Sequence, residues 1–402
     1  MADITVYGAP WCPDCRRTKK FLGEQRVPYT FVDIEADRAG LAFVEGLQGG
    51  GRTIPTVTFA DGSHLLEPSN EELARKIGLT LETARAMYDL AIIGGGPCGL
   101  AAAVYAAREG IDAVVVDRGS LGGNAGVTER IDNYLGFPEG IGGGELADRF
   151  VAQARRYGVE LVSAVGVDGV HAEGDDVVLA LGNGQEICAH AALVATGSAY
   201  RRLDVPGEDE LIGAGVHFCA TCDGPFYKGA DELLVVGGGN SGLEEGLFLS
   251  QFARRIRVIE RGAELRASKL LQDKVLNHPQ FEVRTRSRIT ELRGAGRLEA
   301  VVVRNDRDGT EETWHPRAVF VFVGLDPNAT FLEGVVALDR LGFVVTDDAY
   351  RTALPGLYAA GDVRSGSTKQ LAAAAGEGVA ALLAIRQHLQ RHAHIPRVEM
   401  DA

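Results

Sequence analysis

The residues best suited to chemistry in this 402-residue chain are two Cys-x-x-Cys pairs, Cys12-Pro13-Asp14-Cys15 and Cys219-Ala220-Thr221-Cys222. Two cysteines at this spacing can close a small disulfide and reopen it, which carries two electrons. Four cysteines can also hold a zinc ion or an iron–sulfur cluster. The pairs lie far apart in the chain and neither has the setting of a zinc knuckle. We therefore expect two redox pairs and no metal site.

Composition and charge narrow the class of protein. A length of 402 residues predicts about three domains, and 46% hydrophobic residues is typical of globular chains. The net charge of −14 disfavours nucleic acid and anionic membranes as partners. The first residues lack the pattern of a signal peptide, and no apolar run reaches the ~18 residues of a membrane span. We expect a cytoplasmic protein in which Cys98 and Cys188 are packed thiols.

A glycine-rich turn between a strand and a helix occurs twice, and each copy ends in an acid. In the first copy, a buried strand over residues 89–93 leads into Gly94-Gly95-Gly96-Pro97-Cys98-Gly99 and a helix over 100–109. A second strand over 113–116 then ends at Asp117. Such glycines allow a tight turn and the approach of a pyrophosphate, while the acid binds a ribose diol. The helix N-terminus attracts the phosphates.

The second copy repeats this order with the same spacing from the first glycine to the acid. A strand over 233–236 leads into residues 237–242, a helix over 243–253 and a strand over 256–259 that ends at Glu260. Two copies predict two dinucleotides, one held permanently and one exchanged. Flavin and nicotinamide would supply the hydride chemistry that side chains lack.

The flanking segments indicate which site holds the flavin. Ala195-Thr196-Gly197 follows a strand over 191–194, and a short strand near the C-terminus ends in Gly361-Asp362. Residues 373–378 then open another helix. These segments predict a flavin domain built from both halves of the chain, with the nicotinamide domain inserted between crossings near 204–207 and 324–327.

Residues from about 88 to 390 resemble the low-molecular-weight thioredoxin reductase family. The motifs that carry the resemblance are Gly94–Gly99, Glu129-Arg130-Ile131-Asp132-Asn133-Tyr134, Gly136-Phe137-Pro138, Cys219-Ala220-Thr221-Cys222-Asp223 and Gly361-Asp362. Some details are closest to the flavoprotein subunit of alkyl hydroperoxide reductase: residues 237–242, Glu260 and Leu271-Gln272-Asp273-Lys274.

The resemblance implies FAD in the first site, NAD(P)H in the second, a homodimer, and a nicotinamide domain with two orientations. It also implies that Cys219 and Cys222 receive electrons from the flavin, with Asp223 as general acid–base; otherwise Asp223 is a surface carboxylate. The expected FAD residues are Gly94, Gly96, Gly99, Asp117, Asn133, Thr196, Gly197, Gly361, Asp362 and Gln370. The expected nicotinamide residues are Gly237, Gly239, Gly242, Glu260 and Arg261.

The run Glu260-Arg261-Gly262 bears on the choice of nicotinamide. NADPH-dependent relatives carry a His-Arg-Arg run here that binds the 2′-phosphate. A glutamate repels a phosphate and binds a free ribose diol, which favours NADH. Arg261 could still pair with a phosphate, so NADPH stays open.

Residues 1–78 resemble the glutaredoxin and mycoredoxin family. The similarity lies in Val32-Asp33-Ile34-Glu35 and Arg52-Thr53-Ile54-Pro55-Thr56, and it implies a cis peptide bond before Pro55. Cys12 is the expected attacking thiol, because it opens a helix rich in basic residues, and Cys15 would resolve the mixed disulfide. Those basic residues could equally form a solvated helix face; they are Arg16, Arg17, Lys19 and Lys20.

Two departures from the glutathione-using members disfavour glutathione as the partner thiol. Asp14 stands where they carry tyrosine, and the Gly-Gly-x-Asp-Asp run near the last strand is missing.

We therefore expect an α/β protein: a thioredoxin-like domain (1–78), a helical linker (79–88), a Rossmann-like FAD domain (89–205 and 326–390), an inserted NAD(P)H domain (206–325) and a tail (391–402). The predicted activity is a flavin-dependent disulfide reductase that passes electrons through Cys219–Cys222 to Cys12–Cys15 and an external disulfide. The partner could be a thioredoxin-like protein, a peroxiredoxin or a low-molecular-weight thiol disulfide. The alternatives are a peroxiredoxin reductase component, a thioredoxin reductase whose extra domain only aids docking, and a non-catalytic redox sensor.

Overall fold

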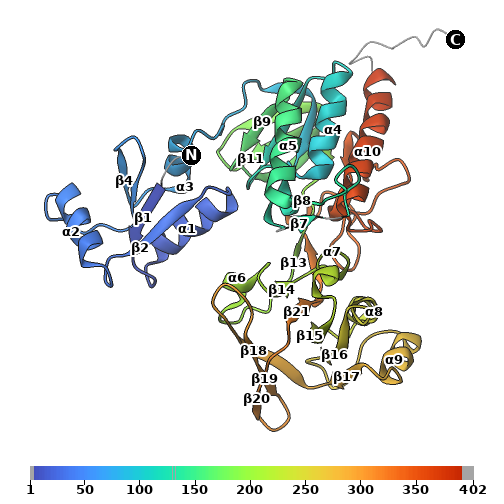
Figure 1. Cartoon of the computed structure of the whole chain (residues 1–402). Coiled ribbons are helices and arrows are strands. Elements are labelled where there is room, and N and C mark those ends of the chain that lie inside the picture. The colour runs from blue at the N-terminus through green and yellow to red at the C-terminus, as the bar shows by residue number, and fades with distance from the viewer. Residues whose placement is uncertain (1–3, 129, 132, 392–402) are drawn as a thin grey trace. The chain divides into compact units, whose positions relative to one another are not determined.

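The computed structural model of the chain (Figure 1) describes residues 4–128, 130–131 and 133–391, and their side chains except those of Val127, Thr221 and Cys222. The motif residues Glu129 and Asp132, the side chain of Cys222 and the tail from 392 lie outside this description. The chain divides into two compact units, residues 1–127, 143–197 and 327–402 in one and 128–142 and 198–326 in the other. Both are α/β, as predicted.

The N-terminal module of the first unit has the thioredoxin-like fold (Figure 1, blue). Its strands lie in the order β2-β1-β3-β4, with β1 and β2 parallel and the other pairs antiparallel. The strands are β1 (Ile4–Gly8), β2 (Tyr29–Asp33), β3 (Thr56–Thr58) and β4 (His64–Leu66). The helices are α1 (Pro13–Glu24), α2 (Arg38–Leu47) and α3 (Asn70–Lys76). Val6, Leu22, Val57 and Leu73 are fully buried in its core.

The rest of the first unit is built on a larger sheet with the strand order β10-β11-β12-β5-β6-β9. These strands are β5 (Met87–Ile93), β6 (Ala113–Asp117), β9 (Glu160–Ser163), β10 (Val167–Glu173), β11 (Asp176–Leu181) and β12 (Glu186–Val194). β23 (Leu357–Ala359), from the C-terminal segment, pairs in parallel with β12. Residues from both ends of the chain therefore share one sheet.

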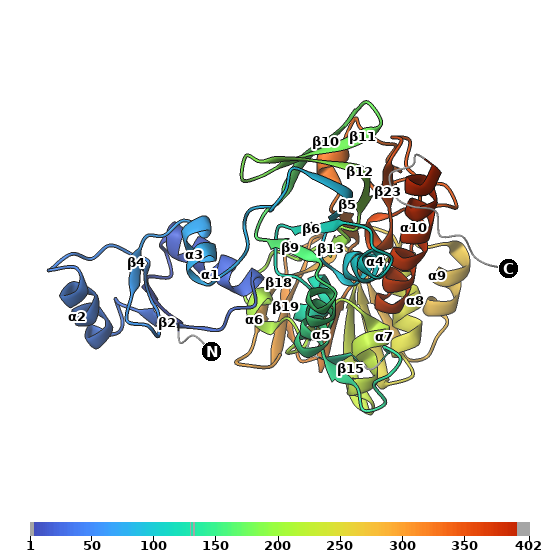
Figure 2. The same cartoon turned by 90° about the horizontal axis from the view of Figure 1, so that it is seen from above.

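The last four residues of β5, Leu90–Ile93, form an uninterrupted apolar run because the strand is covered on both faces there. Leu90 and Ile92 are buried in one core cluster, and Ala91 and Ile93 in another, so both faces of the strand are covered. The helices of this region are α4 (Pro97–Arg108), α5 (Gly143–Arg156) and α10 (Leu371–Arg391), and α4 packs against α10 (Figures 1 and 2).

The helical linker predicted from the sequence is wrong. Residues 79–86, all of which are described, contain no helix. Side chains and backbone of the larger sheet bind this segment instead: Asn183 donates to the carbonyl of Leu81 (2.7 Å), and the amide of Ala84 donates to Glu160 (2.6 Å). These bonds replace the i→i−4 bonds of a helix.

The second unit contains a parallel sheet in the order β14-β21-β15-β16-β17 and a smaller antiparallel sheet, β18-β19-β20. The parallel strands are β14 (Val216–His217), β15 (Ala230–Val236), β16 (Ala253–Ile259), β17 (Phe281–Arg284) and β21 (Ala318–Val321). The antiparallel strands are β18 (Ser287–Arg293), β19 (Ala300–Asn305) and β20 (Glu311–Trp314). The helices are α6 (Glu208–Leu211), α7 (Ala220–Asp223), α8 (Asn240–Leu249) and α9 (Lys269–Leu276).

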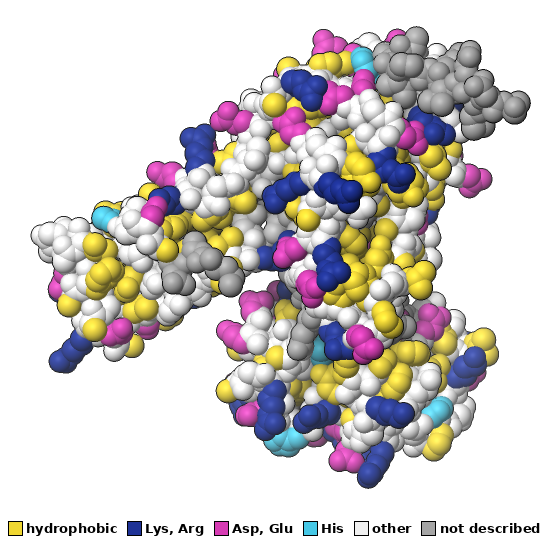
Figure 3. All heavy atoms as spheres, turned by 45° about the horizontal axis from the view of Figure 1, so that its top comes forward, with side chains coloured by type: hydrophobic (Ala, Val, Ile, Leu, Met, Phe, Trp, Pro, Cys, Tyr) yellow, Lys and Arg dark blue, Asp and Glu magenta, His cyan; other side chains and the backbone are white. Residues whose placement is uncertain are grey.

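Basic and acidic side chains are interspersed on the face that Figure 3 shows. Among the described residues, no helix combines the length and the apolar character that crossing a membrane requires.

The contact of α4 with α10 depends on one glycine. A Cβ at Gly378 would overlap the carbonyl oxygen of Cys98, whereas a Cβ at Gly376 on the same helix would meet no described atom within 4 Å. We predict that Gly378→Ala lowers the free energy of unfolding by about 1–3 kcal/mol through overpacking. Gly376→Ala, the matched control, should be neutral or stabilising by up to about 1 kcal/mol. Thermal unfolding of the full chain tests this; equal midpoints for the two variants would contradict it.

Candidate redox and cofactor sites

In the first glycine turn, two glycines leave no room for a Cβ atom, whereas a third borders open space. Gly94 has a φ of +108°, and a Cβ there would lie 2.5 Å from the carbonyl oxygen of Ala195. A Cβ at Gly99 would overlap the carbonyl oxygen of Gly94. Around Gly96 the nearest described atom to an added Cβ is 4.0 Å away, and no described side chain caps the N-terminus of α4. An anionic ligand can therefore approach the amides at this helix end.

Asp117, at the end of β6, holds this turn. Its two carboxylate oxygens accept hydrogen bonds from the amides of Gly95 (2.6 Å) and Gly119 (2.7 Å). Burial raises the pKa of Asp117, and the two amides act in the opposite direction. The carboxylate lies where a ribose diol could donate to it.

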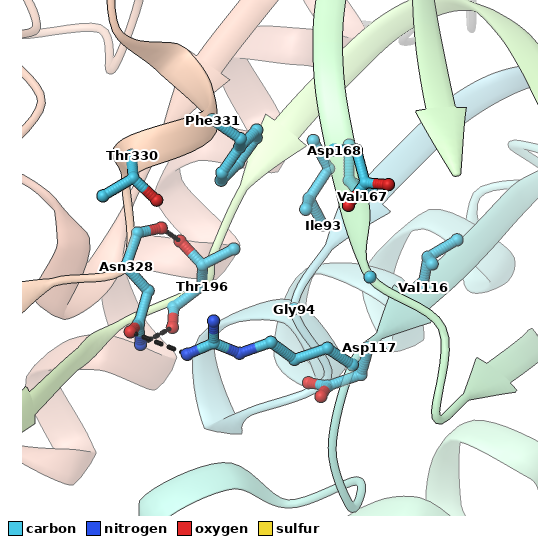
Figure 4. A pocket seen from close by; sticks show the side chains of 12 residues that line it. Ile93, Gly94, Val116, Asp117, Val167, Asp168, Thr196, Asn328, Thr330 and Phe331 are labelled. Carbon is cyan, nitrogen blue, oxygen red and sulfur yellow. Dashed lines mark hydrogen bonds between the residues drawn. The ribbon is translucent and has the colours of Figure 1, made fainter. Parts of the chain in front are cut away.

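A cavity of about 390 Å³ opens beside Asp117 (Figure 4). Its apolar wall includes Ile93 and Phe331, and its polar wall includes Thr196 and Asn328. Such a cavity suits a ligand with a flat ring and a polar, hydroxyl-bearing part.

Asn328 organises the polar wall and was not predicted from the sequence. The backbone carbonyl of Asn328 accepts a hydrogen bond from the hydroxyl of Thr196 (2.7 Å), and the side-chain amide of Asn328 donates one to the backbone carbonyl of Thr196 (2.8 Å). Arg118 donates to the side-chain oxygen of Asn328 (3.0 Å). Arg118 could have been suspected because it follows Asp117; only the tertiary structure places Asn328 here.

The C-terminal Gly361-Asp362 pair lies over α4. Gly361 has a φ of +74°, and a Cβ there would lie 3.0 Å from the Cβ of Cys98. Burial raises the pKa of Asp362, and its Oδ1 is buried without a hydrogen-bond partner among the residues that the structure describes. A buried carboxylate oxygen of this kind calls for a donor from a ligand or from water. Cys98 itself is a packed, buried thiol.

The other expected FAD residues lie in different places. Gly197, with a φ of +67°, follows Thr196 after β12, and Gln370 directly precedes α10. Both belong to the first unit, whereas Asn133 belongs to the second.

The second glycine turn repeats the design of the first. Gly237 has a φ of +123°, and a Cβ at Gly242 would overlap the carbonyl oxygen of Gly237. A Cβ at Gly239 would meet no described atom within 4 Å, and no described side chain caps the N-terminus of α8. Glu260, only 4% exposed, accepts from the amides of Gly238 (2.8 Å) and Gly262 (2.7 Å).

Two arginines flank Glu260. Arg261 is exposed, and the guanidinium of Arg266 lies 3.5 Å from the Glu260 carboxylate while its side chain remains 73% exposed. Arg266 was not predicted as a site residue, because it follows the acid by a loop whose path the sequence does not show. The amide of Ser268 fixes this loop by donating to the side chain of Asn240 (2.7 Å).

In the second cysteine pair, Cys219 lies between β14 and α7, and Cys222 lies within α7. Cys219 is disulfide-bonded, and its carbonyl accepts from the amide of Asp223 (3.1 Å), one helical turn further on. The carboxylate of Asp223 lies 3.5 Å from Nδ1 of His217, a buried residue that was not predicted.

The first cysteine pair differs strongly between its two sulfurs. Cys12 is the N-cap of α1, and its sulfur accepts from the amide of Cys15 (3.1 Å). Cys15 is fully buried, and burial together with the hydrogen bond to Cys12 raises the pKa of Cys15 to about 12. The Ile54–Pro55 bond is cis, as the resemblance implied, and the Ile54 carbonyl lies 3.9 Å from the Cys12 sulfur.

Three of the four basic residues of α1 contact groups other than the Cys12 sulfur. Arg17 pairs with Asp14 at 2.5 Å, and Lys20 lies 3.8 Å from Glu24. Lys19 lies over the ring of Phe31, 4.3 Å from its centre. The amide of Cys15 donates a hydrogen bond directly to the Cys12 sulfur at this helix N-terminus.

Comparison with known proteins supports the two-part organisation. Residues 88–378 match the family model for pyridine nucleotide-disulphide oxidoreductases, and residues 4–65 match the glutaredoxin model. The chain belongs to the pyridine nucleotide-disulphide oxidoreductase family and carries a glutaredoxin domain at its N-terminus.

Three proteins that are similar to this chain are described as thioredoxin reductases. The chain is 36% identical to a thioredoxin reductase of Peptoclostridium acidaminophilum over 310 residues, which cover 76% of this chain and 98% of the relative. The crystal structure of thioredoxin reductase from Streptococcus pyogenes aligns with a TM-score of 0.73 at 35% identity, covering 77% of this chain and all of that one. The enzyme from Giardia duodenalis aligns with a TM-score of 0.71 at 31% identity, covering 76% and 99%.

The predicted resemblance is thereby confirmed: the chain is a thioredoxin reductase-like oxidoreductase, and its family uses FAD and NAD(P)H. The residues present fit such cofactors. Each of two helix N-termini is open at a glycine, each adjacent acid is held by two amides, and Asp362 has a buried oxygen that needs a donor. The described residues contain no cluster of His, Cys, Asp or Glu that could hold a metal ion.

The asymmetry of the first pair predicts which thiol of the reduced glutaredoxin domain reacts. Because the pKa of Cys15 is raised to about 12, Cys15 should remain a thiol between pH 6 and pH 9, roughly, whereas the Cys12 sulfur lies at the N-terminus of α1 and accepts a hydrogen bond from the Cys15 amide. We expect iodoacetamide to modify Cys12 at least about tenfold faster than Cys15 across this range. Peptide mass spectrometry measures both rates, with buried Cys98 as an internal control. Comparable rates for Cys12 and Cys15 would show that the asymmetry is absent in solution.

Proposed function

We propose that this oxidoreductase contains its own electron relay, from NAD(P)H and FAD through Cys219–Cys222 to Cys12–Cys15, and from there to an external disulfide. The observation that carries the proposal is the complete dithiol site in the same chain as two dinucleotide sites. In that site the Cys12 sulfur accepts a hydrogen bond from the Cys15 amide, and the raised pKa of the buried Cys15 keeps it a thiol.

Each thiol step moves two electrons by exchange of sulfur–sulfur bonds. The Cys12 thiolate attacks an external disulfide, forms a mixed disulfide and releases one partner thiol. Cys15 then attacks the Cys12 sulfur, releases the second partner thiol and leaves the Cys12–Cys15 disulfide. Cys219 and Cys222 restore the dithiol by the same exchange. Bound flavin supplies the two-electron link to nicotinamide, and Asp223 gives the proton that a leaving sulfur needs.

We further propose a homodimer in the cytoplasm, where a reducing environment keeps such dithiols functional. The substrate disulfide belongs to a thioredoxin-like protein, a peroxiredoxin or a low-molecular-weight thiol. Thioredoxin-type disulfides are supported by the names of the relatives. The six-segment domain scheme of the sequence analysis remains part of this proposal.

The relay predicts a specific loss in a Cys12→Ser variant. Reduction of a protein disulfide such as oxidised thioredoxin by NADH should fall by at least about 100-fold, because the outgoing thiolate is gone. Reduction of the Cys219–Cys222 pair should stay intact. Stopped-flow flavin absorbance and steady-state turnover measure the two steps.

Cys188→Ser is the matched control, since Cys188 lies on β12 outside both cysteine pairs. Full turnover by Cys12→Ser would show that the glutaredoxin domain only aids docking. Absence of turnover in the unmodified chain with every disulfide tested would favour a sensor.

For the nicotinamide we propose NADH. The Glu260 carboxylate is buried and is held by hydrogen bonds from the amides of Gly238 and Gly262. Because it is fixed in this way, it cannot turn aside to avoid repelling the 2′-phosphate of NADPH. The exposed guanidinium of Arg266 lies 3.5 Å from this carboxylate and can weaken the repulsion, and Arg261, the next residue after Glu260, is exposed.

The carboxylate predicts the ratio of kcat/KM values for the two nicotinamides. The unmodified chain should prefer NADH, and Glu260→Gln should move the ratio about tenfold toward NADPH by removing a charge worth roughly 1.4 kcal/mol. Glu264→Gln is the control, because it removes an exposed charge from the same loop. A preference of the unmodified chain for NADPH would overturn the proposal.

A further inference from the structure

A buried histidine lies next to Asp223 in the second unit. His217 is 6% exposed and stands at the end of β14, two residues before Cys219. Its Nε2 lies 2.6 Å from the hydroxyl of Tyr227, and its Nδ1 lies 3.5 Å from a carboxylate oxygen of Asp223. Both ring nitrogens thus face polar groups on either side of the imidazole.

Three elements hold the imidazole in this place. β14 pairs with β21 so that His217 stands opposite Phe320, and the two ring centres are 5.3 Å apart. Tyr227 ends the short helical turn after α7 and meets the imidazole edge-on at 5.3 Å. Among the side chains that the structure describes, the titratable groups within hydrogen-bonding or ion-pairing distance of His217 are Asp223 from α7 and Tyr227 from the following turn.

Either the Tyr227 hydroxyl or Nε2 of His217 can be the donor in their 2.6 Å contact, and we take the hydroxyl as the donor. A tyrosine hydroxyl that donates to Nε2 makes this nitrogen the acceptor, so the proton resides on Nδ1. Nδ1, which then carries the proton, lies 3.5 Å from a carboxylate oxygen of Asp223. Tyr227 acts through His217 to present a donor to Asp223.

We propose that His217 is a positioning residue for the reduction of the Cys219 disulfide, with Tyr227 fixing its tautomer; this rests on the proposed acid–base role of Asp223. The Nδ1–H orients the Asp223 carboxyl one helical turn after Cys219 and stabilises the carboxylate that forms when the acid has given up its proton.

The step balances with groups already named. The sulfur–sulfur bond breaks and takes up an electron pair that the family's flavin supplies. One proton comes from Asp223 and the second from solvent, and the products are two thiols. His217 keeps its proton throughout and contributes a hydrogen bond to the carboxylate.

Two substitutions separate positioning from packing. His217→Phe keeps a ring against Tyr227 and Phe320 but removes both nitrogens. His217→Asn places an amide donor near the position of Nδ1. Single-turnover transfer from reduced flavin to the disulfide should fall about tenfold in His217→Phe and recover to within about threefold in His217→Asn, as expected for a lost and a restored hydrogen bond to a charged group.

The pH profile of this transfer is a readout that packing alone would not move. Loss of the Nδ1–H destabilises the carboxylate, so Asp223 keeps its proton to higher pH. The falling limb of the profile in His217→Phe should move up by about one pH unit. Flavin reduction by NADH should not change in either variant. His278→Phe, which replaces a histidine packed edge-on against Phe281, is the control.

Nitrogen NMR of histidine-labelled protein gives a readout independent of turnover. The resonances absent from His217→Phe should show the neutral Nδ1–H tautomer in the unmodified chain, and Tyr227→Phe should weaken that preference. An Nε2–H tautomer, equal transfer rates in His217→Phe and the unmodified chain, or no recovery in His217→Asn would each overturn the proposal.

Asp223→Asn separates this proposal from the one on which it rests. Unchanged transfer in Asp223→Asn removes the acid–base role of Asp223, and the role of His217 with it. Slowed transfer in Asp223→Asn with unchanged transfer in His217→Phe removes only the role of His217.

Discussion

An acid that fixes the shape of a glycine turn is the interaction on which both candidate cofactor sites depend. Asp117 ends β6 and Glu260 follows β16, and each accepts one hydrogen bond from a glycine-turn amide and one from the amide two residues after the acid. The turn then has one shape, and the amides at the following helix N-terminus remain available for phosphate. Replacing either acid would free the turn as well as remove the ribose contact proposed for it, so the shape of the turn and the proposed binding would change together.

The first cysteine pair obeys a different constraint, which is close packing: Cys12 is 4% exposed and Cys15 0%. In the first pair, Cys15 is sealed behind Gly8, where a Cβ would lie 2.6 Å from its sulfur. This close approach removes the Cys15 sulfur from solvent and leaves Cys12 as the sulfur at the helix end. A dithiol with one reactive and one protected sulfur can attack a partner and then release it.

The sequence predicted the parts of the sites that are local in the chain. Both glycine turns, both acids and the place of Cys12 at the start of a helix follow from spacing, because a strand, a turn and a helix fix the geometry of neighbouring residues. Arg118, Arg266 and His217 were missed although each lies within a few residues of a predicted one. A charged or aromatic side chain near a site can adopt many orientations, and the packing of the folded chain selects one of them.

By itself the sequence determined the α/β class, the two dinucleotide turns and the two redox pairs, since these depend on short-range periodicity and on residue types with few conformational alternatives. Only the tertiary structure decided that Asn328 hydrogen-bonds to Thr196 and that residues 79–86 form no helix. It also decided that Tyr227 and Asp223 both contact the imidazole of His217. Such contacts depend on how separate elements pack, and the free energy of that packing is shared among many residues at once.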